Sequence, residues 1–151
     1  MYSQDSPYHI GYVLAITTGF RLGEVLGLLW KDIDFDKHTA TVNQTLGHDN
    51  KLKANAKTNS SKRTILIPKA TIEALRKHKI TVNKNKMRFG SAYQDLDLIN
   101  CSRYGIPIER GTMRKYLDKI ILKAGLKRIK LRITNTYIST FISYIHSYWG
   151  Y

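Results

Sequence analysis

The stretch TTGFRLGEVLGLLW, from Thr17 to Trp30, carries the strongest structural signal in this 151-residue sequence. Gly19 suits the left-handed backbone that ends a preceding apolar helix over residues 8–17. From Arg21 onward, apolar residues recur at positions 22, 25, 26 and 29, which is the spacing of one helical face. We therefore predict a second helix from Arg21 to Trp30. Its first residue is unusual, because a helix N-terminus favours acidic side chains.

The next part of the chain predicts strands. Residues 36–38 form a turn, and 39–46 alternate like a β-strand, with Ala40, Val42 and Gln44 on one side. The polar, basic segment 47–63 has the composition of a loop, and the short strand TILIP follows it. Together these segments predict a small antiparallel sheet with a long basic connection.

Two more helices complete the predicted elements, at Lys69–His78 and Gly111–Ala124, with a loop at 84–93 and a turn at Gly105. Gly125 is expected to end the last helix. The inward face of that helix is predicted to hold Met113, Tyr116, Leu117, Ile120 and Ile121. The expected fold class is α+β and mainly helical, with one domain and no internal repeats.

The charge balance indicates the class of partner. The chain has 25 lysines and arginines against 11 acids, a formal net charge of +14. Such an excess usually marks a polyanion partner, here nucleic acid, although a basic surface without such a partner is the alternative. The single cysteine, Cys101, excludes an internal disulfide framework.

Other classes of protein and site are disfavoured. No apolar run reaches the ~18 residues of a membrane helix, and the first residues lack the basic region of a signal peptide. We therefore expect a cytoplasmic location and no membrane partner. The five histidines and one cysteine show no metal-ligand spacing, so no metal is expected.

Four ordered segments resemble one known family. TTGFRLGEVLGLLWKDIDF is similar to the opening motif of the phage integrase or tyrosine recombinase catalytic domain, T-G-x-R-x-x-E-x-x-x-L-x-W-x-D-I-D. AKTNSSKRTILIP resembles the β-hairpin of that family with its lysine, and NCSRYGIPI and ILKAGLKRI resemble segments that lead to its second active-site cluster. The resemblance covers roughly Tyr8 to Lys130 and implies that family's catalytic-domain fold.

The resemblance gives Arg21 a role. In the family, the matching arginine grips the scissile phosphate of DNA, and a guanidinium can donate two parallel hydrogen bonds to phosphate oxygens. Glu24 is then expected to orient Arg21 rather than to react. The alternative is a solvated surface arginine that pairs with Glu24 three residues later.

The resemblance also implies roles for the basic segment. The family's lysine matches Lys57, which would protonate the leaving 5′-oxygen of the DNA as a general acid. Lys51, Lys53 and Lys62 lie nearby and compete for this assignment, which spacing to RTILIP favours for Lys57. Lys62 and Arg63 would then position phosphates.

The family's reaction implies the chemistry and the partner. A tyrosine attacks a phosphodiester of double-stranded DNA and forms a 3′-phosphotyrosine, and arginines stabilise the charge on the transferring phosphate. The reaction needs no metal and no nucleotide cofactor, so none is expected here.

The sequence departs from the family after Leu131. Arg132 matches the arginine of the motif H-x-L-R-H-T-H only if the surrounding mismatches are accepted. One permitted coding of residues 132–140, read in another frame, gives H-E-L-R-T-H-I-S-A, which is close to the motif. We interpret 1–131 as a partial catalytic domain, with its C-terminal part missing, and 132–151 as an out-of-frame tail. A truly divergent tail is the alternative.

Three functions follow from these features. The first is a recombinase catalytic fragment that binds DNA and is inactive alone, because the tyrosines after Arg132 follow it too closely to match the family nucleophile. The second is a DNA-binding or regulatory protein without chemistry, whose partners include an intact integrase or a second copy of the chain. The third is an RNA-associated basic protein, for which the sequence contains no RNP-like aromatic motif.

Overall fold

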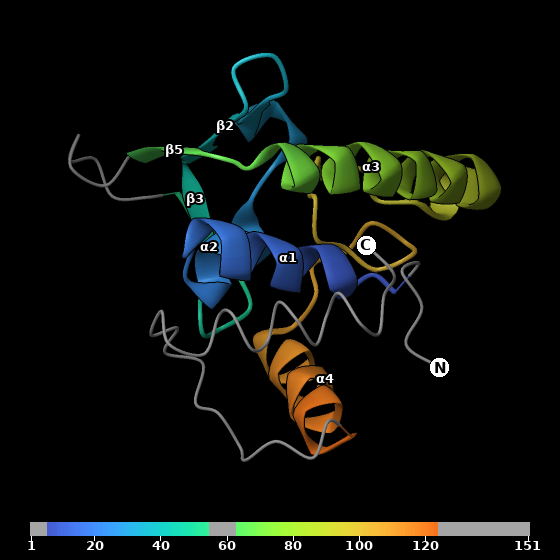
Figure 1. The fold of residues 1–151 in the computed structure, drawn as a ribbon. Helices are drawn as coiled ribbons and strands as arrows, with labels where there is room; N and C mark the ends of the chain where they lie inside the picture. Colours follow the sequence, from blue (N-terminus) through green and yellow to red (C-terminus); the bar gives the residue numbers. More distant parts are fainter. Residues whose placement is uncertain (1–5, 55–62, 124–151) are drawn as a thin grey trace.

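The computed structural model describes residues 6–54 and 63–123 (Figure 1). The helices are α1 (His9–Thr18), α2 (Leu22–Gly27), α3 (Lys69–Phe89) and α4 (Arg110–Lys123), with 3₁₀ turns at Trp30–Asp32 and Gly90–Ala92. The strands are β1 (Ile33–Asp34), β2 (Thr39–Val42), β3 (Gln44–Leu46), β4 (Leu52–Ala54) and β5 (Arg63–Leu66). The predicted α+β class with a helical majority is confirmed.

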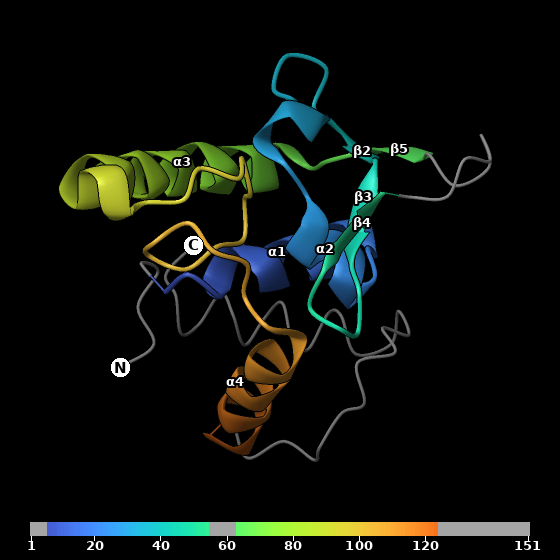
Figure 2. The same cartoon turned by 180° about the vertical axis from the view of Figure 1, so that it is seen from behind.

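The helices and strands occupy different parts of the molecule. In both views α3 lies beside α1, and α4 projects away from them (Figures 1 and 2). The strands gather at the end of this arrangement where α1 leads into α2 and where α3 begins (Figure 1). The α1–α2 junction, which carries Arg21, therefore lies next to the strands.

The strands form two small antiparallel sheets instead of one. The first has the order β1-β2-β5, with Ala40 opposite Ile65 and Val42 opposite Arg63. The second pairs β3 with β4, so the prediction that 47–63 is entirely loop was wrong for Leu52–Ala54 and for Arg63, which begins β5.

The predicted strand over 39–46 is interrupted at Asn43, which places Gln44 in a different sheet from Ala40 and Val42. The Asn43 side-chain amide donates to the Asp32 carboxylate at 2.7 Å. This tertiary contact lies at the point where the chain leaves the first sheet for the second.

Helix α2 is shorter than predicted and ends at Gly27. Strand β3 lies close to this end of the helix, since a Cβ on Gly27 would lie 2.9 Å from the Cα of Thr45. Leu28 is extended, and its carbonyl accepts a hydrogen bond from the Ile99 N–H at 3.0 Å. Leu28 and Trp30 thus form backbone hydrogen bonds with the segment 97–99 in place of the hydrogen bonds that would continue the helix.

Helix α3 is longer than predicted and continues through the expected loop to Phe89. No glycine or proline interrupts it before Gly90, and Val82 is buried on its inner face. Gly90 then ends the helix with a positive φ of 48°.

The buried residues form two clusters, and the second one anchors α4. That cluster contains Tyr12, Leu26, Leu46, Ile108, Met113 and Leu117. Met113 and Leu117 are buried as predicted, and Tyr116 is partly buried against them. The remaining predictions for this helix, the inward side chains of Ile120 and Ile121 and the stop at Gly125, fall outside what the structure describes. Within 6–54 and 63–123, none of the helices combines the length and apolar composition of a membrane crossing.

Candidate nucleic-acid interface

Arg21 lies at the N-terminal boundary of α2, with an extended backbone and an exposed side chain. Its backbone N–H donates to Glu24 Oε2 at 2.8 Å. Its guanidinium forms no ion pair or hydrogen bond with another residue in the described ranges. The cation is therefore directed to solvent at the start of a helix, where its charge is not offset by an acid.

The loop before Arg21 is held in place by side-chain hydrogen bonds. Thr18 Oγ1 donates to the Leu14 carbonyl at 2.6 Å and accepts from the Phe20 N–H at 3.2 Å. Gly19 has a φ of 70°, as predicted for the end of α1, and the Phe20 ring is buried. These contacts fix the backbone conformation of the residues that lead into Arg21.

Glu24 pairs with Arg63 and not with the guanidinium of Arg21. Arg63 Nη1 donates to Glu24 Oε1 at 3.0 Å, and Nη2 donates to Oε2 at 2.7 Å. The Glu24 side chain is 10% exposed and that of Arg63 is 42% exposed. Glu24 contacts Arg21 through the Arg21 backbone N–H, and the alternative, a pair between the two side chains, is not observed.

Arg63 joins the strands to the helix that begins at Arg21. It is the first residue of β5, opposite Val42 of β2. Its guanidinium also lies over the Phe20 ring, 5.6 Å from the centroid. Glu24 and Phe20 together fix the guanidinium beside the α1–α2 junction, and the exposed part of Arg63 adds to the cationic surface there.

Arg110, the first residue of α4, was not singled out from the sequence. Its Nη1 donates to the Leu46 carbonyl at 2.8 Å, and the same atom faces Gly23, where a Cβ would collide with it. Burial, followed by the positive charge of Arg114, lowers the pKa of Arg110. No motif marks this residue, because its contacts join three elements that are far apart in the sequence.

The three arginines give the start of α2 an excess of positive charge. Arg21, Arg63 and Arg110 all lie at or against α2, and among the described residues Glu24 is the one acid that contacts any of them. We call Arg21, Arg63, Arg110 and Glu24 the arginine cluster. Such an arrangement can bind an anion with oxygen acceptors, such as a phosphate.

Lys57 and Lys62 lie outside the described residues. The segment that contains them joins β4 to β5, which belong to different sheets. Its C-terminal neighbour is Arg63, which is in contact with Glu24. In the described part of the chain, no group of three or more His, Cys, Asp or Glu residues is placed to hold a metal ion.

Sequence comparisons agree with the motifs. The profile of the Phage integrase family matches residues 3–136. A tyrosine recombinase XerC-like protein of Caldanaerobacter subterraneus subsp. tengcongensis is 32% identical over 141 residues. The match covers 83% of this chain but 36% of that protein, so this chain spans a minor part of the relative's length.

Similar solved structures share the fold. The Tn1549 transposon integrase in complex with circular intermediate DNA has a TM-score of 0.59 at 19% identity, covering 93% of this chain and 47% of that one. The XerH site-specific recombinase bound to a palindromic difH substrate gives 0.59 at 22%, covering 86% and 32%. The XerA recombinase gives 0.58 at 15%, covering 98% and 52%.

Proposed function

This chain belongs to the phage integrase family, and we propose that its arginine cluster binds the sugar–phosphate backbone of double-stranded DNA. In this proposal the Arg21 guanidinium binds a DNA phosphate, as the family motif TGFR implies. The observation that carries the proposal is the exposed Arg21 guanidinium, which has no acidic partner among the described residues and sits beside an arginine fixed by Glu24.

Electrostatics supports a phosphate at this place. A guanidinium and a phosphate form two parallel, charge-assisted hydrogen bonds, which are stronger than bonds between neutral groups. Arg21 and Arg63 carry two positive charges against the single carboxylate of Glu24, and an anion bound beside them would balance the remaining charge. Both effects favour a phosphate over a neutral ligand.

The contacts of each residue suggest its role in DNA binding. Arg21 binds the phosphate directly, while Glu24 holds Arg63 and the Arg21 backbone in position. In this proposal Lys57 acts as the general acid of the family reaction, and Lys62 and Arg63 contact flanking phosphates. Solved relatives in complex with DNA support the partner, since the named Tn1549 integrase and XerH structures contain it.

We further propose that the 151-residue chain does not complete strand exchange by itself. Residues 132–151 depart from the family pattern that supplies a second arginine, a histidine and the tyrosine. The chain would then act through DNA binding, either as a recombinase fragment or as a regulatory protein that interferes with an intact integrase.

The test is a fluorescence anisotropy titration of a labelled 30-base-pair duplex with the full chain. Arg21→Ala is expected to weaken binding about tenfold or more, because a hydrogen bond to a charged group contributes about 1.5–3 kcal/mol. Lys84→Ala is the control, since it removes one exposed positive charge from the far half of α3. Equal losses in the two variants would contradict the role given to Arg21.

A further inference from the structure

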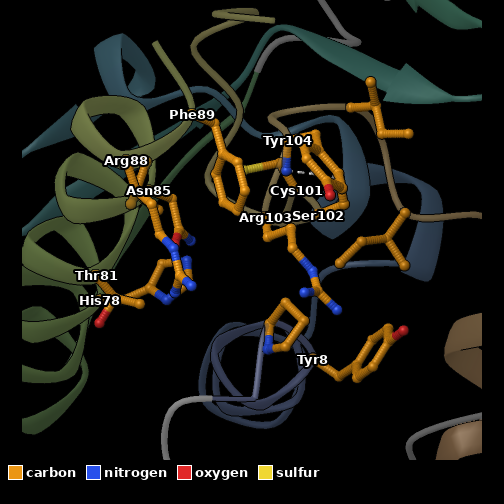
Figure 3. A pocket seen from close by; sticks show the side chains of 14 residues that line it. Tyr8, His78, Thr81, Asn85, Arg88, Phe89, Cys101, Ser102, Arg103 and Tyr104 are labelled. Atoms are coloured by element: carbon orange, nitrogen blue, oxygen red, sulfur yellow. Dashed lines mark hydrogen bonds between the residues drawn. The ribbon is translucent and has the colours of Figure 1, made fainter. Parts of the chain in front are cut away.

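A second candidate site lies at the other end of α1 from Arg21. An open cavity of about 620 Å³ is lined by the second half of α3, the loop 101–108 and the residues just before α1 (Figure 3). This volume is in the range of small-molecule sites in proteins. Tyr8 at this cavity and Arg21 flank opposite ends of the ten-residue α1, so the two places are separated by about 15 Å of helix.

Two arginines face this cavity from opposite walls. Arg88 extends into it from α3 and Arg103 from the loop (Figure 3). Each guanidinium lies near its neighbouring ring, Arg88 at 5.6 Å from Phe89 and Arg103 at 6.0 Å from Tyr104. Neither has an ion pair with a residue in the described ranges, and no acid occurs among the described residues that line the cavity.

Aromatic rings form another part of the wall. Phe89 and Tyr104 contact each other across the cavity rim, with ring centroids 4.6 Å apart and planes tilted by 53°. Tyr104 is 44% exposed, although large apolar side chains are usually covered. An aromatic surface beside two cations favours a ligand that is planar at one end and anionic at the other.

The remaining polar groups suit a heterocycle better than a second anion. The Asn85 side chain points into the space and offers both a donor and an acceptor (Figure 3). Burial lowers the pKa of His78, and its Nε2 lies 2.8 Å from the Ile99 carbonyl, so that ring nitrogen is already engaged within the protein. The positive charge is thus concentrated on Arg88 and Arg103.

We propose that this cavity binds a single nucleotide, with its phosphate between Arg88 and Arg103 and its base against Phe89 and Tyr104. Aromatic and arginine planes recognise unpaired bases in this way, and every base offers a π-face to them. A paired base stays in its stack and does not enter a cavity, so the nucleotide is either free or part of an unpaired strand. This activity goes beyond duplex binding by the arginine cluster and does not depend on it.

Calorimetric titration of the full chain tests the proposal with three probes: deoxyadenosine 5′-monophosphate, deoxyadenosine, and a single-stranded three-nucleotide deoxyadenosine oligomer. We expect saturable binding of the monophosphate, and at least tenfold weaker binding of the nucleoside without phosphate. Tighter binding of the oligomer would identify an unpaired strand as the source of the nucleotide, and equal or weaker binding would identify a free nucleotide.

Matched substitutions locate the site. Arg103→Gln and Arg88→Gln should each weaken binding of the monophosphate at least tenfold, and Tyr104→Leu at least fivefold. Lys84→Gln on the same helix, outside the cavity lining, should leave it unchanged. Arg21→Ala should also leave it unchanged, which separates this site from the duplex surface. Absence of saturable binding by both phosphorylated probes, or binding that survives the double variant of Arg88 and Arg103, would overturn the proposal.

Discussion

Arg63 and Glu24 are 39 residues apart in the sequence and form a two-point ion pair, with Nη2 at 2.7 Å from Oε2. The pair ties the first residue of β5 to the helix that begins next to Arg21. Arg63 directly follows the segment that contains Lys57 in the sequence, so this ion pair is adjacent to that segment along the chain.

Removal of Arg63 should destabilise the fold moderately. Arg63→Ala leaves the mostly buried Glu24 carboxylate with the Arg21 N–H as its one remaining hydrogen-bond donor among the described residues. We expect a loss of about 1–2 kcal/mol in the free energy of unfolding, a value kept small because Arg63 is partly exposed. Urea denaturation measures it, and Arg63→Lys should recover part of the loss. A loss below the measurement error would show that the pair has no structural role.

Gly27 should not tolerate a side chain. A Cβ there would lie 2.9–3.0 Å from backbone atoms of Thr45 and Leu46, and backbone cannot rotate away as a side chain can. We expect Gly27→Ala to destabilise the protein by about 1–3 kcal/mol. Gly111→Ala is the matched control, because a Cβ in α4 at that position meets nothing within 4 Å. It should be neutral or stabilise by up to about 1 kcal/mol through helix propensity.

Stability should fall in mild acid through His9. Burial, followed by the nearby charge of His78, lowers the pKa of His9 from 6.5 to about 4. The unfolded chain therefore binds this proton near pH 6.5, while the folded chain does not until about pH 4. The free energy of unfolding should drop as the pH falls through this window and level off below it.

His9→Leu isolates this effect. The variant should lose less stability than the parent between pH 7 and pH 4.5 in urea denaturation at each pH. Other groups titrate in both proteins, so the difference between the two curves reports His9. Parallel curves would contradict the assignment.

The parts of the fold that follow from local physics were predicted from the sequence. Gly19 ends α1 because a left-handed residue is needed there, and Met113 and Leu117 are buried because helical spacing places them on one face. The errors arose where distant segments intervene. Backbone hydrogen bonds of Leu28 and Trp30 with the segment 97–99 accompany the early end of α2, and the Asn43–Asp32 bond accompanies the division of one expected strand between two sheets.

The residues of the candidate site could likewise be predicted only in part from the sequence. The motif around Arg21 identified it as a phosphate-binding candidate, and the exposed position of its side chain is consistent with that prediction. The ion pair of Glu24 with Arg63 was not predicted, because Arg63 lies on a strand 39 residues away in the sequence and the fold brings it to the helix. Arg110 was missed, since its contact with Gly23 exists only in the folded protein.

The 151-residue chain should form no covalent adduct with DNA. On a nicked suicide substrate, denaturing electrophoresis is expected to show no shifted protein, because the tyrosines after Arg132 do not match the family's nucleophile position. A variant whose codons from residue 132 onward are read in the alternative frame and continued to the family's tyrosine should form one. An adduct of the original chain, mapped to any of its tyrosines, would contradict the proposed inactivity.

The salt dependence of duplex binding tests the central claim most directly. The logarithm of the association constant for a 30-base-pair duplex should fall linearly and steeply with the logarithm of salt concentration, because phosphate contacts release counterions. Arg21→Gln should weaken binding and reduce that slope by about one, the value for one lost phosphate contact, whereas Lys84→Gln should leave both unchanged. A slope for Arg21→Gln equal to that of the parent protein would contradict a direct contact between Arg21 and a DNA phosphate.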